Sequence, residues 1–198
     1  MSVRAEPGFG SIPNMLSLSR IVVTVPLCAA IAYEAWAIAL ALWAWVSVTD
    51  WLDGALARAW GQTSAIGRVL DPLADKVAVL GTLVCLIPAG QAEGYLSPWM
   101  VAVLIGREFM VTGLRGELER RGSAFGADIF GKLKMVAQVV VISLALVVAW
   151  LGRASVPVWM IQTLIASVWI MLLATVLSGL RYAWMAITVM TQQRGDGR

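Results

Sequence analysis

The chain has 198 residues, of which 60% are hydrophobic, and it carries a formal net charge of +3 at pH 7. Its mean hydropathy of +0.80 lies well above that of soluble globular domains, which are only about 45–50% apolar. This composition excludes an ordinary soluble enzyme. The length predicts one integral membrane domain of about six spans joined by short connections.

Apolar runs predict an all-α membrane protein with six transmembrane helices, preceded by an interfacial segment over residues 1–14. The expected spans cover residues 15–33, 36–60, 70–89, 98–119, 127–151 and 157–190. Glycine, proline and charged residues separate these runs. Residues 1–198 therefore read as a single domain, with a six-helix bundle over residues 15–190.

The distribution of Lys and Arg predicts the orientation of these spans. With the N-terminus inside, every Lys and Arg except Arg153 falls on the cytoplasmic side or in the half of the chain near it. We therefore expect both termini to be cytoplasmic, in a bacterial inner membrane. Cys28 and Cys85 lie inside apolar runs and match no metal-binding spacing, so we expect them to be inert packing residues.

Four carboxylates stand out within residues 50–75. Asp50 and Asp53 are three residues apart, and Asp71 and Asp75 are four apart, so each pair projects from one face of a helix. Between them, residues 61–67 are rich in Gly, Ser and Thr, which predicts a short loop. The expected arrangement is a helix, a loop and a helix, with the four acids facing one another.

Close carboxylates cannot all remain ionised without positive charge among them. The chain has no His, and Arg58 and Lys76 are the basic residues directly beside the acids. An all-oxygen site suits Mg²⁺ or Mn²⁺ better than zinc, and it favours a phosphate-bearing substrate. The alternatives are ion pairs at a cytoplasmic helix end, or the transport site of a divalent-cation transporter, which would lie near the bilayer midplane.

A second group of charges lies in the fourth and fifth expected spans. Arg107 and Arg115 are eight residues apart on nearly the same helical face, and Lys132 and Lys134 follow Gly131. Charges within a span usually face a pocket or a partner, so these cations are candidates for binding the phosphate of a second, anionic substrate. The alternatives are pairing of Arg107 with Glu108 and ordinary snorkelling of the lysines.

The string Asp50-x2-Asp53-Gly54-x2-Ala57-Arg58-x8-Gly67-x3-Asp71-x3-Asp75 resembles the signature of the CDP-alcohol phosphotransferase family. The resemblance implies a six-helix membrane fold, usually a homodimer, with two divalent cations held by the four acids. It also implies that Asp75 is the general base. The residues it assigns to CDP-diacylglycerol binding are Asn14, Ser17, Gly54, Ala57, Arg58 and Ser64.

Three further stretches, residues 12–20, 106–115 and 131–134, resemble family members that use sn-glycerol 3-phosphate. They imply transfer of a phosphatidyl group from CDP-diacylglycerol to that acceptor, with release of CMP. The expected acceptor-phosphate residues are Arg107, Arg115, Lys132 and Lys134. The chain departs from this pattern at two positions: Gly116 stands where such family members often have an acid, and Met135 stands where they often have Thr. Inositol phosphate therefore remains an alternative acceptor.

Overall fold

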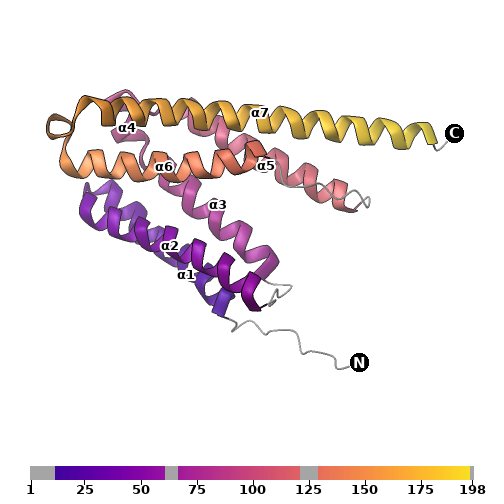
Figure 1. The fold of residues 1–198 in the computed structure, drawn as a ribbon, viewed down its shortest axis with the longest axis horizontal. Coiled ribbons are helices and arrows are strands. Elements are labelled where there is room, and N and C mark those ends of the chain that lie inside the picture. Colours follow the sequence, from indigo (N-terminus) through magenta and orange to yellow (C-terminus); the bar gives the residue numbers. More distant parts are fainter. Residues whose placement is uncertain (1–11, 61–66, 121–128, 197–198) are drawn as a thin grey trace. The chain divides into compact units, whose positions relative to one another are not determined.

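A computed structural model describes residues 12–60, 67–120 and 129–196, with side chains over 14–52, 70–117, 129 and 131–189. Every regular element within these ranges is a helix, which confirms the all-α prediction. Most of the predicted interfacial segment lies outside the described residues. The helices are α1 Ile12–Ala32, α2 Trp36–Trp60, α3 Gly67–Cys85, α4 Ile87–Glu93, α5 Pro98–Arg120, α6 Ile129–Leu151, the 3₁₀ helix η1 Arg153–Ser155 and α7 Val158–Asp196 (Figure 1).

The third expected span, over residues 70–89, is not one helix. α3 ends at Cys85, and α4 begins two residues later with a bend of 45°. Pro88 explains the break, because it lacks the N–H that would bond to the carbonyl of Val84 and its ring crowds that turn. Pro98 instead occupies the first position of α5, where a missing N–H costs nothing.

Three described stretches are long and apolar enough to cross a membrane, namely 14–32, 131–151 and 158–189. The bent pair of α3 and α4 makes a fourth if it counts as one span, and α2 contains a shorter apolar stretch over 36–52. These helices are those of an integral membrane protein. The count of six spans stays a prediction.

The chain divides into two compact units, and the first comprises residues 1–89 and 142–156. Within it, α1 packs against both α2 and α3 (Figure 1). Gly81 of α3 faces α1, since a Cβ there would make ordinary contacts with Thr24 at 3.5 Å and with Cys28 Sγ at 3.8 Å. Trp43 of α2 donates its indole N–H to the hydroxyl of Ser143 at 2.9 Å, which joins α2 to the C-terminal half of α6.

The two cysteines meet within this first unit. Both are free thiols, and the Cys28 thiol of α1 lies within hydrogen-bonding range of the Cys85 thiol of α3. Neither side chain is fully buried. Residues far apart in the sequence therefore join α1 and α3 near the C-terminal end of each helix.

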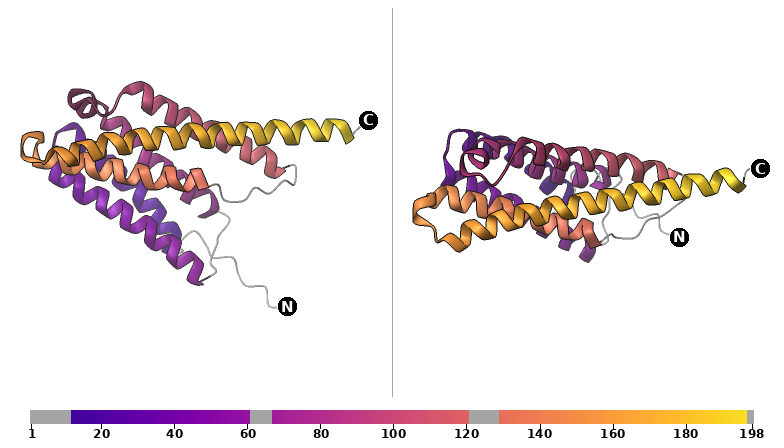
Figure 2. Two further views of the ribbon diagram at one scale, coloured as in Figure 1. Left: turned by 45° about the horizontal axis from the view of Figure 1, so that its top comes forward. Right: turned by 90° about the horizontal axis from the view of Figure 1, so that it is seen from above.

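The second unit comprises residues 90–141 and 157–198. In it α5 runs beside α7, as both views of Figure 2 show. Trp99 and Trp169 connect the two helices with ring centroids 6.4 Å apart. Farther along, Gly179 of α7 leaves room for the Arg107 side chain, because a Cβ on Gly179 would lie 3.2 Å from Arg107 Cγ.

Candidate active site

The first candidate region, which we name the acidic cluster, consists of Ser17, Arg20, Asp50, Asp71 and Asp75 in the first unit. α1 contributes a polar face, because Asn14, Ser17 and Arg20 recur every three residues along a mostly apolar helix. All three side chains are buried. Polar groups buried at such spacing indicate that this face of α1 is turned toward other polar groups.

A chain of hydrogen bonds runs from α2 to α3 through α1. The Arg20 guanidinium forms an ion pair with the Asp50 carboxylate of α2, and it also donates to Ser17 Oγ at 3.4 Å. Ser17 Oγ in turn donates to the carboxylate of Asp71 on α3. The structure thereby brings together two of the four predicted acids, with Ser17 between them.

Arg20 is the countercharge that sequence reasoning did not assign to the acids. Arg58 and Lys76 were identified because they are neighbours of the acids in sequence, whereas Arg20 lies thirty residues before Asp50. Its side chain is 2% exposed, while that of Asp50 is 46% exposed. The carboxylate therefore keeps an open side even while it is paired.

The other predicted residues of this region are only partly described. Asp75 follows Asp71 by one turn of α3 and is partly buried. The side chain of Asp53 lies outside the described set, so a four-acid arrangement is untested. Within the described side chains, no three acids converge on a metal position. The remaining predicted donor-binding residues whose side chains are not described are Gly54, Ala57, Arg58 and Ser64.

The donor atoms that are present fit a hard divalent cation. Asp50 and Asp71 are held against one Ser17–Arg20 pair, and both offer carboxylate oxygens. Such all-oxygen sets are what Mg²⁺ and Mn²⁺ prefer in proteins. The chemistry of the acidic cluster is therefore compatible with the predicted metal, and the number and positions of the ions stay predictions.

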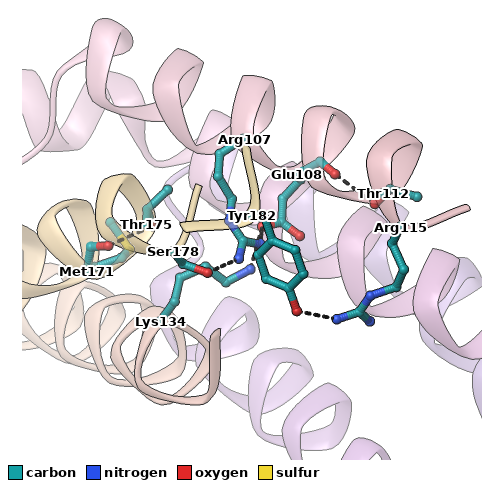
Figure 3. A network of polar contacts seen from close by, with 9 residues as sticks. All are labelled: Arg107, Glu108, Thr112, Arg115, Lys134, Met171, Thr175, Ser178 and Tyr182. Atoms are coloured by element: carbon teal, nitrogen blue, oxygen red, sulfur yellow. Dashed lines mark hydrogen bonds and ion pairs between the residues drawn. The ribbon is translucent and has the colours of Figure 1, made fainter. Parts of the chain in front are cut away.

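The second candidate region, the basic cluster, consists of Arg107, Glu108, Arg115, Lys134, Ser178 and Tyr182 in the second unit (Figure 3). One oxygen of Glu108 accepts from two cations: Arg107 Nη1 at 2.7 Å and the Lys134 ammonium group of α6. Arg107 Nη2 also donates to Ser178 Oγ of α7. The side chains of Arg107, Glu108 and Lys134 are 9%, 10% and 7% exposed, so the ion pairs are almost fully buried.

Tyr182 of α7 connects the two arginines of α5. Its ring lies 6.0 Å from the guanidinium carbon of Arg107 and 5.5 Å from that of Arg115. Arg115 Nη2 also donates to the Tyr182 hydroxyl at 2.6 Å. A ring face within about 6 Å of a cation attracts it by roughly 0.5–2 kcal/mol. Tyr182 therefore holds both arginines on one side of α5, as Figure 3 shows.

The basic cluster contains more positive than negative charge. Arg107 and Lys134 share the Glu108 carboxylate, and Arg115 joins them through Tyr182, so these side chains comprise three cations and one acid. The Nε–H of Arg107 is also buried without a hydrogen-bond partner in the described part of the chain. A buried donor left unpaired costs about 1–3 kcal/mol. An anion bound here would supply an acceptor for this N–H.

Sequence reasoning identified part of this cluster. The alternative pairing of Arg107 with Glu108 is present, but it accounts for only one of the contacts that Arg107 makes. Lys132 is exposed on α6, and no contact to the basic cluster is described for it. Sequence reasoning missed Ser178, Gly179 and Tyr182, although such residues close together in an apolar helix are a detectable signal.

Comparison with known proteins adds an independent finding. The chain matches, over residues 10–180, the model of a protein family described as CDP-alcohol phosphatidyltransferase. A Bacillus subtilis protein is 37% identical over 138 residues, covering 69% of this chain and 66% of that protein. A Cereibacter sphaeroides protein is 36% identical over 143 residues, covering 68% and 62%.

A third relative, from Escherichia coli K12, is 35% identical over 143 residues, covering 67% of this chain and 75% of its own length. All three relatives carry the name CDP-diacylglycerol–glycerol-3-phosphate 3-phosphatidyltransferase. The chain spans slightly less than two thirds of the length of the first two.

Proposed function

Since the chain belongs to the CDP-alcohol phosphatidyltransferase family, we propose that it transfers a phosphatidyl group from CDP-diacylglycerol to sn-glycerol 3-phosphate. The products would be phosphatidylglycerophosphate and CMP. The names of the relatives support this reaction. The observation that carries the choice of acceptor is the basic cluster, where three cations lie around one acid and the buried Arg107 Nε–H has no hydrogen-bond partner in the described part of the chain, which suits a phosphorylated alcohol better than a neutral one.

The acidic cluster is proposed to bind the donor. The family is generally metal-dependent, and Asp50, Asp53, Asp71 and Asp75 would hold two divalent cations, Mg²⁺ or Mn²⁺. When bound, such cations neutralise charge on the diphosphate oxygens of the donor. The CDP portion would contact a set of residues on α1, α2 and the following loop, namely Asn14, Ser17, Gly54, Ala57, Arg58 and Ser64.

The basic cluster is proposed to bind the phosphate of the acceptor. Arg107 and Arg115 can each present a planar fork of N–H donors to phosphate oxygens. Lys134 adds a point charge, and Lys132 is retained as a fourth candidate. Fixing the phosphate in this way would orient the acceptor's free hydroxyl for reaction.

The reaction is a direct displacement at phosphorus. The acceptor hydroxyl oxygen attacks the β-phosphorus of CDP-diacylglycerol, and its proton passes to a carboxylate oxygen of Asp75. A new P–O bond forms to the glycerol phosphate, while the bond to the bridging oxygen of CMP breaks. CMP leaves with that oxygen and its electron pair.

We also propose a setting for this reaction. The bacterial relatives and the spanning helices favour the inner membrane, with both termini and both clusters on the cytoplasmic side, where phosphorylated metabolites are available. The family resemblance further suggests a homodimer.

An acceptor panel tests the proposal. Purified protein in detergent receives CDP-diacylglycerol with Mg²⁺ or Mn²⁺, and CMP release is followed with sn-glycerol 3-phosphate, inositol phosphate, glycerol and serine. We expect CMP only with sn-glycerol 3-phosphate. Release with inositol phosphate alone would keep the mechanism and replace the acceptor. No release with any acceptor from folded protein would contradict the enzyme assignment, and metal uptake by liposomes containing the protein would then test the transporter alternative.

A further inference from the structure

Glu108 is a buried acid in the middle of a group of cations for which the proposed reaction has no direct use. Its carboxylate shares one oxygen between Arg107 and Lys134, which come from α5 and α6. The three side chains are nearly excluded from solvent, at 9%, 10% and 7% exposure. Buried cations of this kind require a counter-anion, and Glu108 supplies it within the chain.

Glu108 is the one acid among the side chains that define the basic cluster. Arg107 and Lys134 carry two positive charges against one carboxylate, and Arg115 adds a third through its contact with Tyr182. Arg107, Arg115, Lys134 and Glu108 together carry a formal charge of +2, from three cations and one acid. A phosphate monoester carries about −1.5 to −2 at pH 7, so one such group would bring this set close to neutrality.

The hydrogen-bonding capacity of Arg107 also favours the binding of an anion such as a phosphate monoester. A guanidinium group has five N–H donors, and described contacts use Nη1 for Glu108 and Nη2 for Ser178. The Nε–H is buried and has no hydrogen-bond partner among the described residues. The carboxylate thus occupies one edge of the guanidinium group and leaves donors for the oxygens of another anion.

From these contacts we infer that Glu108 is an internal anion that competes with the acceptor's phosphate for Arg107 and Lys134. In the empty protein it keeps two buried cations paired. When a phosphate monoester binds beside the same cations, the two anions repel each other, so Glu108 weakens the binding that Arg107 and Lys134 provide. This inference rests on the proposed function for its ligand, and it assigns to Glu108 a positioning and affinity-limiting role rather than a contact with the reacting atoms.

Inorganic phosphate tests this inference without turnover. The full-length protein in detergent, without donor or metal, is titrated with sodium phosphate against sodium chloride of equal ionic strength, and the melting temperature is followed. The variants are Glu108→Gln, which keeps the shape and removes the charge, and Glu34→Gln, a control that removes an exposed acid elsewhere. Arg107→Met tests whether the phosphate response comes from the basic cluster.

We expect Glu108→Gln to melt at a lower temperature than the wild type in chloride, because two buried cations lose their partner. Phosphate should then raise its melting temperature by more than it raises that of the wild type. The concentration giving half of this effect should be roughly tenfold lower than in the wild type, because a like charge beside the anion is gone. Glu34→Gln should behave as the wild type, and Arg107→Met should lose the response.

Two outcomes distinguish a failure of this inference from a failure of the proposed function. If phosphate stabilises the wild type and Arg107→Met abolishes the effect, the phosphate site stands. An unchanged or higher half-effect concentration in Glu108→Gln would then overturn the competition alone. If phosphate does not stabilise the wild type at all, the assignment of the acceptor phosphate to this cluster fails, and the inference fails with it.

Glu108→Asp covers the case in which Glu108→Gln does not fold. The shorter side chain keeps the charge but withdraws it from Arg107 and Lys134, so the half-effect concentration should fall by a smaller factor, roughly two- to threefold. A half-effect concentration equal to or above that of the wild type would contradict the competition.

Discussion

The acidic cluster and the basic cluster each contain a described partner of the opposite charge, Arg20 in the first and Glu108 in the second. They differ in burial. Arg20 is 2% exposed, but its partner Asp50 is 46% exposed, whereas Arg107, Glu108 and Lys134 are all at or below 10%. A half-exposed carboxylate can receive a hydrated cation without rearrangement of the fold, because Mg²⁺ keeps several of its waters.

In the basic cluster Arg107, Glu108 and Lys134 are instead nearly excluded from solvent and held by contacts from three helices, while Arg115 is exposed. An anion that enters it meets few waters and several oriented donors, so each contact is stronger than it would be at the surface. If the clusters bind donor and acceptor as proposed, we expect donor binding to depend mainly on added metal and acceptor binding mainly on the fold. The following changes test this division, from the largest expected effect to the smallest.

Asp75→Asn should have the largest effect, because it removes the proposed proton acceptor while keeping the size of the side chain. General bases contribute about 10²–10⁴-fold to rate, so we expect CMP release to fall by roughly 10³-fold. The measurement is kcat at saturating substrates and metal, with the melting temperature as a control for folding. Full retained turnover would exclude Asp75 as the base.

Arg20→Gln should change the metal concentration that CMP release requires, and it should leave the KM for the acceptor unchanged. Arg20 places a positive charge against Asp50, so it opposes binding of a second cation there. We expect the Mn²⁺ concentration for half-maximal CMP release to fall roughly fivefold, with an unchanged KM for sn-glycerol 3-phosphate. Arg153→Gln serves as the control. A change in acceptor KM without a change in metal dependence would reverse the division between the clusters.

Tyr182→Phe should weaken binding of the acceptor and leave binding of the donor unchanged. The substitution keeps the ring near both arginines and removes the hydroxyl that accepts from Arg115 at 2.6 Å. One such hydrogen bond to a charged group contributes about 1.5–3 kcal/mol when buried, and the exposure of Arg115 reduces this. We expect the KM for sn-glycerol 3-phosphate to rise about three- to fivefold, with the KM for CDP-diacylglycerol unchanged. Equal increases in both would indicate a general loss of structure.

Gly179→Ala should have the smallest effect. The added Cβ would lie 3.2 Å from Arg107 Cγ, so the arginine must shift by a few tenths of an ångström against its contacts with Glu108 and Ser178. We expect about a twofold rise in acceptor KM, because a small misplacement of a binding group weakens its contacts. Gly113→Ala is the matched control, since a Cβ there meets nothing within 4 Å. Identical kinetics in the two variants would show that Arg107 adapts freely.

The helices and most of the charged residues of the two clusters could be predicted from the sequence, because both depend on the spacing of residues along single helices. Helix positions came from apolar runs, and the acids and cations were identified from spacing along single helices. Partners on other helices were not accessible in this way. Arg20, Ser178 and Tyr182 reach the clusters through packing between helices. A polar residue in an apolar helix can be noticed in one sequence, but the sequence does not say which residue on another helix it contacts. The break at Leu86 was missed because the apolar run continues through it, although Pro88 marked the position.

The proximity of Cys28 and Cys85 provides a way to measure whether α1 and α3 move relative to each other. The two thiols join α1 and α3, the helices that also carry Ser17 and Asp71, but they lie many residues farther along each helix. Their rate of cross-linking by a mild oxidant therefore reports whether α1 and α3 stay in register. A rate that is the same with and without substrate would describe a rigid pair of helices, and a rate that falls would record their separation as the acids take up their ligands.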